Sequence, residues 1–243
     1  MNIDLPLILT LIVGVSGAIW MVDGLLFARA RAARLEQLQN QYPGWQDSGS
    51  SDAKLFAAAA ARSATDPVVV EYAKSFFPVL AFVLVLRSFL YEPFQIPSSS
   101  MVPTLQVGDY ILVNKYRYGL RLPVTRTKIW DMASPQRGDV MVFYPPHAND
   151  QYYIKRVIGI PGDRVQYRNK QLTVNGEAIP REWLVDAEGT ARMQIGLETP
   201  RGDRAHPVQV DRMRPARDFF VVVRPGHYFM MGDNRDNSSD SRV

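Results

Sequence analysis

The chain has 243 residues, of which 47% are hydrophobic, and its 28 basic and 24 acidic residues give a net charge of +4. A mean hydropathy of −0.14 excludes a protein embedded mostly in lipid, and the absence of a dense lysine or arginine block argues against nucleic-acid binding. The chain contains no cysteine, which excludes thiol catalysis, disulfides and cysteine-ligated metals.

Residues 1–28 are predicted to form a first transmembrane helix. The stretch from Leu5 to Phe27 is almost entirely apolar and exceeds the ~20 residues that a helix needs to cross a bilayer. A cleavable signal peptide is the alternative, but no basic residue precedes the apolar stretch, which is also long for such a signal. Because Arg29, Arg31 and Arg34 follow directly, the positive-inside rule places the next loop in the cytoplasm.

Residues 29–75 are predicted to form an exposed, partly helical cytoplasmic connector, and residues 76–92 a second transmembrane helix. The apolar stretch from Phe76 to Leu86 is short for a membrane span, but the Arg87 side chain could extend to the interface. A buried helix of a soluble core is the alternative. If the second segment does cross the membrane, the remainder of the chain returns to the outer side.

Residues 93–243 are predicted to form a mainly β domain, with partly open antiparallel sheets that follow the two transmembrane helices. Short segments rich in β-branched and aromatic residues alternate with Gly-Asp dipeptides and with Asn175-Gly176, which is typical of a hairpin turn. The expected strands cover residues 110–113, 140–144, 165–167, 172–174 and 219–223. Residues 181–217 are polar, with Pro, Gly and Arg throughout, and are interpreted as an inserted β-ribbon or loop region.

A serine–lysine pair is one catalytic arrangement that this domain could provide. Three consecutive serines end at Ser100, and Lys155 follows an apolar stretch. Lysine has a pKa of ~10.4, so it can deprotonate a serine only where burial lowers that pKa towards about 7–8. In a strand, Lys155 would point to one face and Arg156 to the other, where Arg156 could bind an acid. The residues alone leave open that Lys155 is an ordinary solvated lysine and the serines a plain loop.

The histidines offer a different arrangement, a Ser-His-Asp triad. The chain has three, His147, His206 and His227, and no Gly-x-Ser-x-Gly motif supports such a triad. They are scattered and show no metal-binding spacing. The sequence therefore predicts neither a metal site nor another cofactor.

Ordered motifs between residues 87 and 242 resemble those of bacterial type I signal peptidases, a family of membrane-bound Ser/Lys proteases. The resemblance covers most of the chain from Phe76 onward, and its motifs are residues 87–94, 96–105, 108–113, 153–163 and 232–242. It implies an enzyme that hydrolyses peptide bonds through an acyl-enzyme and removes signal peptides from exported preproteins. The cut would follow small residues at the first and third positions before it.

The resemblance also implies a role for each matching residue. Ser100, directly before a methionine, would be the nucleophile, and Lys155 the general base. Ser98 would help to bind the oxyanion, and Ser238 would orient the lysine amine. Structural support would come from Asp240, Arg242 and Arg156. Positions near the apolar substrate-binding cleft are matched by Phe94, Ile96, Met101, Leu105, Tyr153 and Ile154.

Location and partners follow from the same resemblance. It implies a multi-pass protein of the bacterial inner membrane whose catalytic domain lies on the periplasmic side. Its partners would be membrane lipid and preproteins that bear signal peptides, with no nucleic acid. Ser99 stands where the family often has glycine, which is a small difference. The family normally continues past this point with an aromatic-Gly segment and a closing strand, so the sequence is expected to be a piece of a longer protein.

Two other functions stay open. A self-cleaving Ser/Lys protease like the SOS-response repressors would share the catalytic fold, but those proteins carry a DNA-binding domain where this chain has two apolar segments. A membrane-anchored β-domain could instead bind a partner without catalysis.

Overall fold

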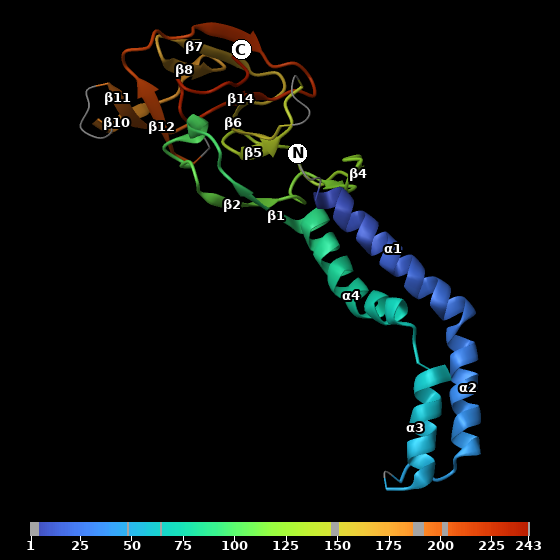
Figure 1. Cartoon of the computed structure of the whole chain (residues 1–243). Helices are drawn as coiled ribbons and strands as arrows, with labels where there is room; N and C mark the ends of the chain where they lie inside the picture. The colour runs from blue at the N-terminus through green and yellow to red at the C-terminus, as the bar shows by residue number, and fades with distance from the viewer. Residues whose placement is uncertain are drawn as a thin grey trace. The chain divides into compact units, whose positions relative to one another are not determined.

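The structure, a computed structural model, describes residues 5–47, 49–63, 65–146, 151–186, 192–200 and 204–242. The chain divides into two compact units (Figure 1). The first, called here the helical unit, comprises Met1–Tyr91 and Gly119–Trp130. The second, called here the β unit, comprises Glu92–Tyr118 and Asp131–Val243.

The helical unit contains two helices that are long and apolar enough to cross a membrane. They are α1 (Leu5–Leu26) and α4 (Val68–Val85), which η1 (Leu86–Leu90) extends as a π-helical turn. The sequence predicted the second span from residue 76, whereas the helix begins at Val68. Hydropathy missed its first turns because Glu71 and Lys74 interrupt the apolar pattern there.

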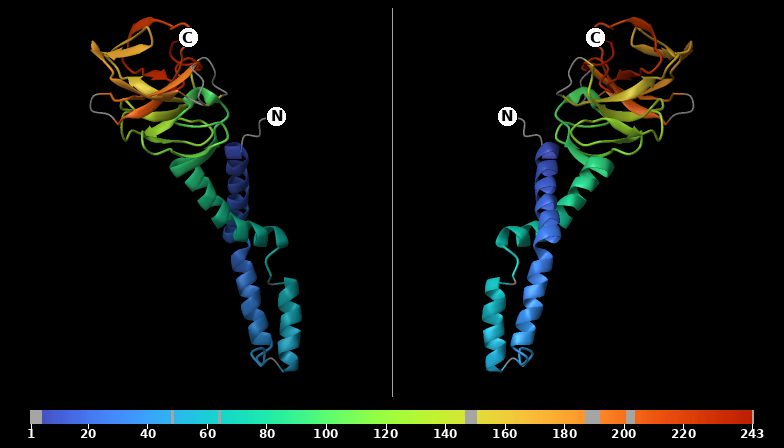
Figure 2. Two further views of the ribbon diagram at one scale, coloured as in Figure 1. Left: turned by 90° about the vertical axis from the view of Figure 1, so that its left-hand side faces the viewer. Right: turned by 90° about the vertical axis from the view of Figure 1, so that its right-hand side faces the viewer.

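Helices α2 (Ala28–Gln41) and α3 (Ser51–Ser63) lie between the two apolar helices in sequence and pack side by side (Figure 2). They provide the helical character that the sequence predicted for the connector. The unit also includes a small hairpin of β3 (Leu120–Arg121) and β4 (Lys128–Trp130).

Helices α1 and α4 pack directly against each other. Gly17 allows this approach, because a Cβ atom at that position would lie 2.7 Å from the Phe77 ring. The Trp20 ring meets the same phenylalanine edge-on, with ring centroids 5.4 Å apart. The one acid of α1, Asp23, is buried and pairs with Arg31 at 2.6 Å and with Lys74 of α4 at 3.2 Å. Buried charges need such partners, so Asp23 ties the two helices together.

The β unit is built from antiparallel sheets, which confirms the predicted fold class. Strands β1 (Tyr91–Gln95) and β2 (Tyr110–Asn114) form one pair. A second sheet has the order β14-β6-β5, from β14 (Phe229–Met231), β6 (Tyr153–Gly159) and β5 (Val140–Phe143). A third has the order β13-β7-β8-β9, from β13 (Phe219–Val222), β7 (Arg164–Arg168), β8 (Gln171–Val174) and β9 (Glu177–Ala178).

The core of the β unit lies between the second and third sheets. Its most deeply buried members are Val165, Tyr167, Leu172 and Met231, each 1% exposed or less. Buried and more exposed side chains alternate along β7, Leu172 is the buried residue of β8, and every side chain of β14 is buried. This is expected for apolar residues on the inner face of a sheet.

The predicted Gly-Asp turns share one geometry in three places, at residues 106–109, 136–139 and 160–163. In each, the aspartate carboxylate accepts a hydrogen bond from the backbone N–H three residues earlier, at 2.8–2.9 Å. The glycine before it has φ between 84° and 97°, a region that disfavours other residues. Asn175-Gly176 forms the predicted two-residue hairpin between β8 and β9.

Residues 181–217, predicted as an inserted ribbon or loop, contain a three-stranded antiparallel sheet. Its order is β10-β11-β12, from β10 (Arg181–Asp186), β11 (Met193–Glu198) and β12 (His206–Asp211). The sheet confirms the predicted β-ribbon, but the bounds of its strands were not predicted, because they carry Arg, Glu, His and Pro as well as apolar residues.

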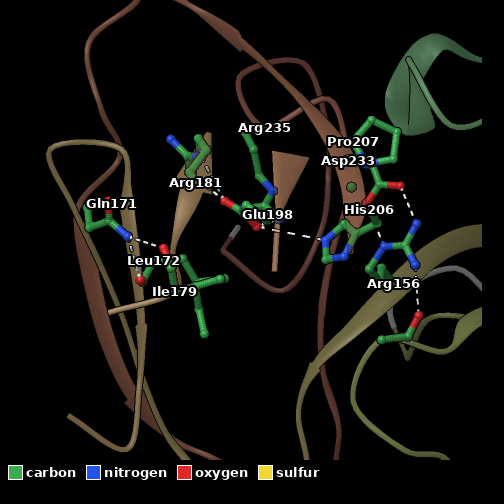
Figure 3. Close-up of polar contacts among 12 residues, drawn as sticks. Arg156, Gln171, Leu172, Ile179, Arg181, Glu198, His206, Pro207, Asp233 and Arg235 are labelled. Atoms are coloured by element: carbon green, nitrogen blue, oxygen red, sulfur yellow. Dashed lines mark hydrogen bonds and ion pairs between the residues drawn. The ribbon is translucent and has the colours of Figure 1, made fainter. Parts of the chain in front are cut away.

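Glu198, at the end of β11, joins this sheet to the chain segment after β14 (Figure 3). Its carboxylate accepts hydrogen bonds from Arg235 at 2.6 and 2.9 Å and from Arg181. Glu198 and Arg235 are fully buried. Burial alone would raise the pKa of Glu198, but the two guanidinium groups hold it below its usual value.

Replacing Glu198 with glutamine should therefore strongly destabilise the β unit. The change leaves two buried guanidinium groups without a counter-charge, which costs about 3–5 kcal/mol in comparable cases. The measurement is urea unfolding of the full chain in detergent, followed by the β-sheet signal in circular dichroism. Glu182→Gln, at an exposed position of the neighbouring strand β10, is the control and should change the unfolding free energy by less than about 0.5 kcal/mol. Equal effects of the two changes would contradict this role of Glu198.

Candidate active site

Ser100 lies in the middle of a short 3-10 turn, η2 (Ser99–Met101). Met101 is 1% exposed and anchors the turn in the core. Asn234 holds the turn from outside: its backbone N–H donates to the Ser100 carbonyl at 3.0 Å, and its side-chain amide donates to the Ser99 carbonyl at 3.1 Å. The Ser100 side chain is therefore presented from a backbone that is fixed on both sides.

Lys155 projects from β6, the central strand of its sheet, between β5 and β14. The residue is 5% exposed, and its Nζ donates to the Ser100 Oγ at 2.7 Å and to the Ile154 carbonyl at 2.9 Å. Nζ also lies 5.3 Å from the centroid of the Tyr153 ring. Burial lowers the pKa of Lys155 below its usual value, although the charges of Asp240 and Asp233 act in the opposite direction.

Ser98 is the last extended residue before the turn. Its Oγ lies 3.4 Å from the Ser100 Oγ and is exposed. The hydroxyl groups of Ser98 and Ser100 therefore lie on the same side of the chain.

Successive side chains of a strand point to opposite faces. Arg156, next to Lys155, therefore lies on the other face of β6, where it binds an acid. Its Nε and Nη2 donate to the Asp233 carboxylate at 2.8 and 2.7 Å, and its Nη1 donates to the Gly138 carbonyl at 2.8 Å. The hydroxyl of Thr104 donates to the same carboxylate at 2.5 Å. Asp233 is fully buried and connects the lysine strand to the serine segment.

Asp240 and Arg242 form a second ion pair beside the site. The Asp240 carboxylate accepts from Arg242 Nε and Nη2, both at 2.7 Å, and from the Gly232 backbone N–H at 3.0 Å. Burial would raise the pKa of Asp240, but Arg242 keeps it below its usual value. Arg242 thus stabilises the charged form of Asp240 close to the lysine.

Ser238 lies beside the backbone of Ser100. A Cβ atom added to Gly232 would collide with both the Ser100 carbonyl oxygen and the Ser238 Oγ, so the three residues meet closely. The Lys155 amine donates to Ser100 and to Ile154 within the described chain, and no hydrogen bond joins it to Ser238. The structure brings Ser238 to the site, but without the direct contact to the amine that the family resemblance implied.

The six residues expected near a substrate cleft divide into two groups. Ile96 and Met101 are 3% and 1% exposed, so they lie beneath the protein surface. The partly exposed residues, which can touch a ligand, are Phe94, Leu105, Tyr153 and Ile154.

Sequence reasoning missed Asp233, Thr104 and Asn234 as site residues. The sequence places Asp233 in a Gly-Asp dipeptide and in the motif 232–242 but indicates no partner for it, and Gly232 before it has no left-handed φ. No signal in the sequence distinguishes its role from that of the three turn aspartates, because the difference lies in the distant partner, Arg156.

The histidines do not form a triad in the described structure. His206 is 4% exposed, and neither ring nitrogen makes a hydrogen bond. Burial lowers its pKa to about 4. His227 is exposed and contacts the Pro225 carbonyl at 3.0 Å, while His147 lies outside the described residues. Within the described chain, no cluster of three His, Cys, Asp or Glu residues could hold a metal ion.

Known proteins resemble the chain over this whole region. The family described as signal peptidase, peptidase S26, matches residues 69–243. Signal peptidase I of Pseudomonas aeruginosa is 47% identical over 245 residues, which cover 100% of this chain and 83% of that protein. Signal peptidase I of Pseudomonas fluorescens is 45% identical with the same coverage. A crystal structure of a signal peptidase I from Enterococcus faecalis V583 is 31% identical and covers 46% of this chain and 88% of its own, with a TM-score of 0.31.

The burial of Lys155 should make the stability of the β unit depend on pH. The folded state favours the neutral amine, whereas an unfolded lysine titrates near ~10.4. Between the lowered folded pKa and that value, the unfolded state binds more protons, so the unfolding free energy rises with pH. Lys155→Met removes the buried amine and should stabilise the protein at neutral pH, by about 1.4 kcal/mol for each unit of lowering.

The measurement is urea unfolding of wild type and Lys155→Met between pH 6 and pH 10. The difference between their unfolding free energies should narrow as the pH rises. Lys54→Met, at an exposed position of α3, is the control and should leave the pH dependence as in the wild type. A constant gap across the pH range would mean that Lys155 is not held neutral by burial.

Proposed function

The chain belongs to the signal peptidase family S26 and is a serine peptidase, and from this premise we propose that it removes signal peptides from exported preproteins with Ser100 and Lys155 as its catalytic pair. The observation that carries the proposal is the 2.7 Å separation between Lys155 Nζ and Ser100 Oγ, with the amine buried. That distance permits direct proton transfer.

In the proposed reaction, Ser100 Oγ attacks the carbonyl carbon of the scissile bond and gives its proton to Lys155 Nζ. The negative charge on the carbonyl oxygen is stabilised by the Ser100 backbone N–H and the Ser98 hydroxyl, an interaction worth about 3–4 kcal/mol in such sites. As the C–N bond breaks, Lys155 returns the proton to the leaving amine. A water molecule then attacks the acyl-enzyme, again with Lys155 as base, and releases the new carboxylate and Ser100.

Selection of small residues before the cut fits the partly exposed apolar side chains around the serine. Phe94 packs edge-on against Tyr152, with ring centroids 4.9 Å apart, and Tyr153 packs against Phe143 at 6.5 Å. In this proposal the depressions beside these side chains are shallow and accept alanine more readily than bulky groups. An extended substrate could pair with a neighbouring strand edge.

We further propose that α1 and α4 with η1 anchor the enzyme as two membrane spans. Their length and apolar composition support this topology. The arginines at positions 29, 31 and 34 favour a cytoplasmic position for the connector. The segment from residue 93 onward, the proposed catalytic domain, would then lie on the periplasmic side of the bacterial inner membrane. There it would meet its partners, membrane lipid and exported preproteins.

Ser100→Ala and Lys155→Ala should each abolish processing of a preprotein. The first variant removes the nucleophile and the second removes the base, so either loss should lower the rate by at least about a thousandfold. The measurement is conversion of a purified preprotein to its mature form by the full chain in detergent or lipid. Ser99→Ala is the matched control, because this serine lies next to Ser100 and its hydroxyl only accepts a hydrogen bond from Asn237.

Full activity in either the Ser100 or the Lys155 variant would refute the catalytic pair and favour a non-catalytic binding domain. Cleavage confined to the chain itself, with no processing of the preprotein, would favour the self-cleaving alternative.

Ser98→Ala should lower kcat about 10²–10³-fold while changing KM little, because the lost donor acts on charge that develops only in the transition state. Ser98→Thr retains the hydroxyl and should restore most of the rate. Steady-state kinetics on a peptide substrate measures both values. An unchanged kcat in the alanine variant would remove Ser98 from the oxyanion site.

A further inference from the structure

The β unit contains a cavity of about 160 Å³ that neither Ser100 nor Lys155 lines. Its walls are mostly aliphatic, from Val157, Ile158, Leu172, Val174, Ile179 and Pro200. Val157, Ile158, Leu172 and Ile179 are buried, whereas Asn175 and Glu177 are exposed, so the cavity reaches into the packed interior and also opens to solvent.

Most polar groups around the cavity are already engaged. Arg137 donates to the Asp163 carboxylate at 2.6 and 2.7 Å, and Asn175 donates to the same carboxylate at 2.9 Å. The Gly138 carbonyl accepts from Arg156 at 2.8 Å. Glu177 is exposed to solvent. The buried polar group that lines the cavity without a hydrogen bond is the imidazole of His206.

His206 is 4% exposed, and within the described chain both of its ring nitrogens lack hydrogen-bond partners. The nearest acid is Glu198, whose Oε2 lies 3.8 Å from Nε2, too far for a hydrogen bond. That carboxylate is already bound by Arg181 and Arg235 (Figure 3). An unpaired buried polar group destabilises the folded state, and a ligand in this cavity could satisfy it.

Burial keeps His206 neutral, despite the two acids beside it. Burial is the main cause that lowers its pKa to about 4, and Arg156 and Arg235 add to this effect against Asp233 and Glu198. At neutral pH the imidazole therefore offers one N–H donor and one nitrogen acceptor. A hydroxyl group matches either nitrogen, because it both donates and accepts.

The cavity's size and walls define the rest of the ligand. An aliphatic cavity of about 150 Å³ is large enough to hold benzene. An anionic ligand would lose its hydration without gaining a counter-ion, since Arg137 is already paired with Asp163. A cationic ligand could pair with Glu177, but that side chain is exposed to solvent, where an ion pair is worth little. We propose that this cavity is a binding site for a small neutral aromatic alcohol of the size of phenol, with its ring among the aliphatic walls and its hydroxyl hydrogen-bonded to His206.

The test uses phenol itself, with toluene as the probe that has the same shape but no hydroxyl. The chain has three histidines, so labelling histidine with ¹⁵N gives three sets of imidazole signals. The His206→Phe variant identifies the set that belongs to His206. Titration of the full chain in detergent with phenol should shift the His206 signals saturably and leave those of exposed His227 unchanged. Toluene should bind more weakly than phenol and cause no hydrogen-bond shift at the ring nitrogens.

Calorimetry against matched detergent blanks then compares variants. His206→Phe keeps an aromatic ring but no nitrogen, so the affinity for phenol should fall at least tenfold while that for toluene changes less than about threefold. Val174→Phe fills the cavity and should abolish binding of both compounds. Ser100→Ala should bind phenol as the wild type does, because the site does not include the serine.

The inference is overturned if phenol causes no saturable shift at His206. It is also overturned if phenol shifts the His227 signals equally, or if His206→Phe lowers the affinities for phenol and toluene by the same factor. If His206→Phe fails to fold, His147→Gln and His227→Gln identify the His206 signals by elimination, so the wild-type titration still decides the question. None of these measurements depends on peptidase activity, so failure here leaves the proposed function untouched.

Discussion

The proposed reaction depends on keeping the Lys155 amine uncharged beside the Ser100 hydroxyl. Two aspartates near Lys155 work against this, because their negative charges favour the ammonium form. Each of them, however, is bound by its own arginine through two hydrogen bonds, Asp233 by Arg156 and Asp240 by Arg242. Each arginine partly neutralises the negative charge of its aspartate, so the aspartate raises the pKa of Lys155 less than an unpaired carboxylate would. Burial then remains the dominant influence on the amine.

The segment after β14 brings together groups that lie far apart in sequence. Asp233 binds Arg156 on the lysine strand and Thr104 on the serine segment, and Asn234 holds the backbone of Ser100. Gly232 makes this convergence possible, because any side chain there would occupy the space of the Ser100 carbonyl. The distance between the Ser100 and Lys155 side chains therefore depends on a third segment of the chain.

The sequence predicted the strands whose side chains are β-branched or aromatic, and it predicted the turns whose glycines have a left-handed φ, because those are local properties. For residues 181–217 it predicted a β-ribbon or loop but not the strands β10 to β12 one by one, because charged residues there, such as Glu198, are buried through partners elsewhere in the chain. The residues of the site could be named from motif order, but their contacts could not. Whether Lys155 is buried, and where Ser238 points, depends on packing between distant segments, and no sequence pattern records that.

Lys155 and His206 show how one physical effect has opposite consequences for two bases in the same unit. Burial lowers the pKa of both side chains. A lysine starts near ~10.4, so lowering its pKa brings it towards the range in which a base works at neutral pH. A histidine starts near ~6.5, and lowering its pKa to about 4 leaves it permanently neutral and too weak to accept a proton at neutral pH. A water-poor interior therefore makes lysine a usable base and reduces histidine to a neutral hydrogen-bonding group.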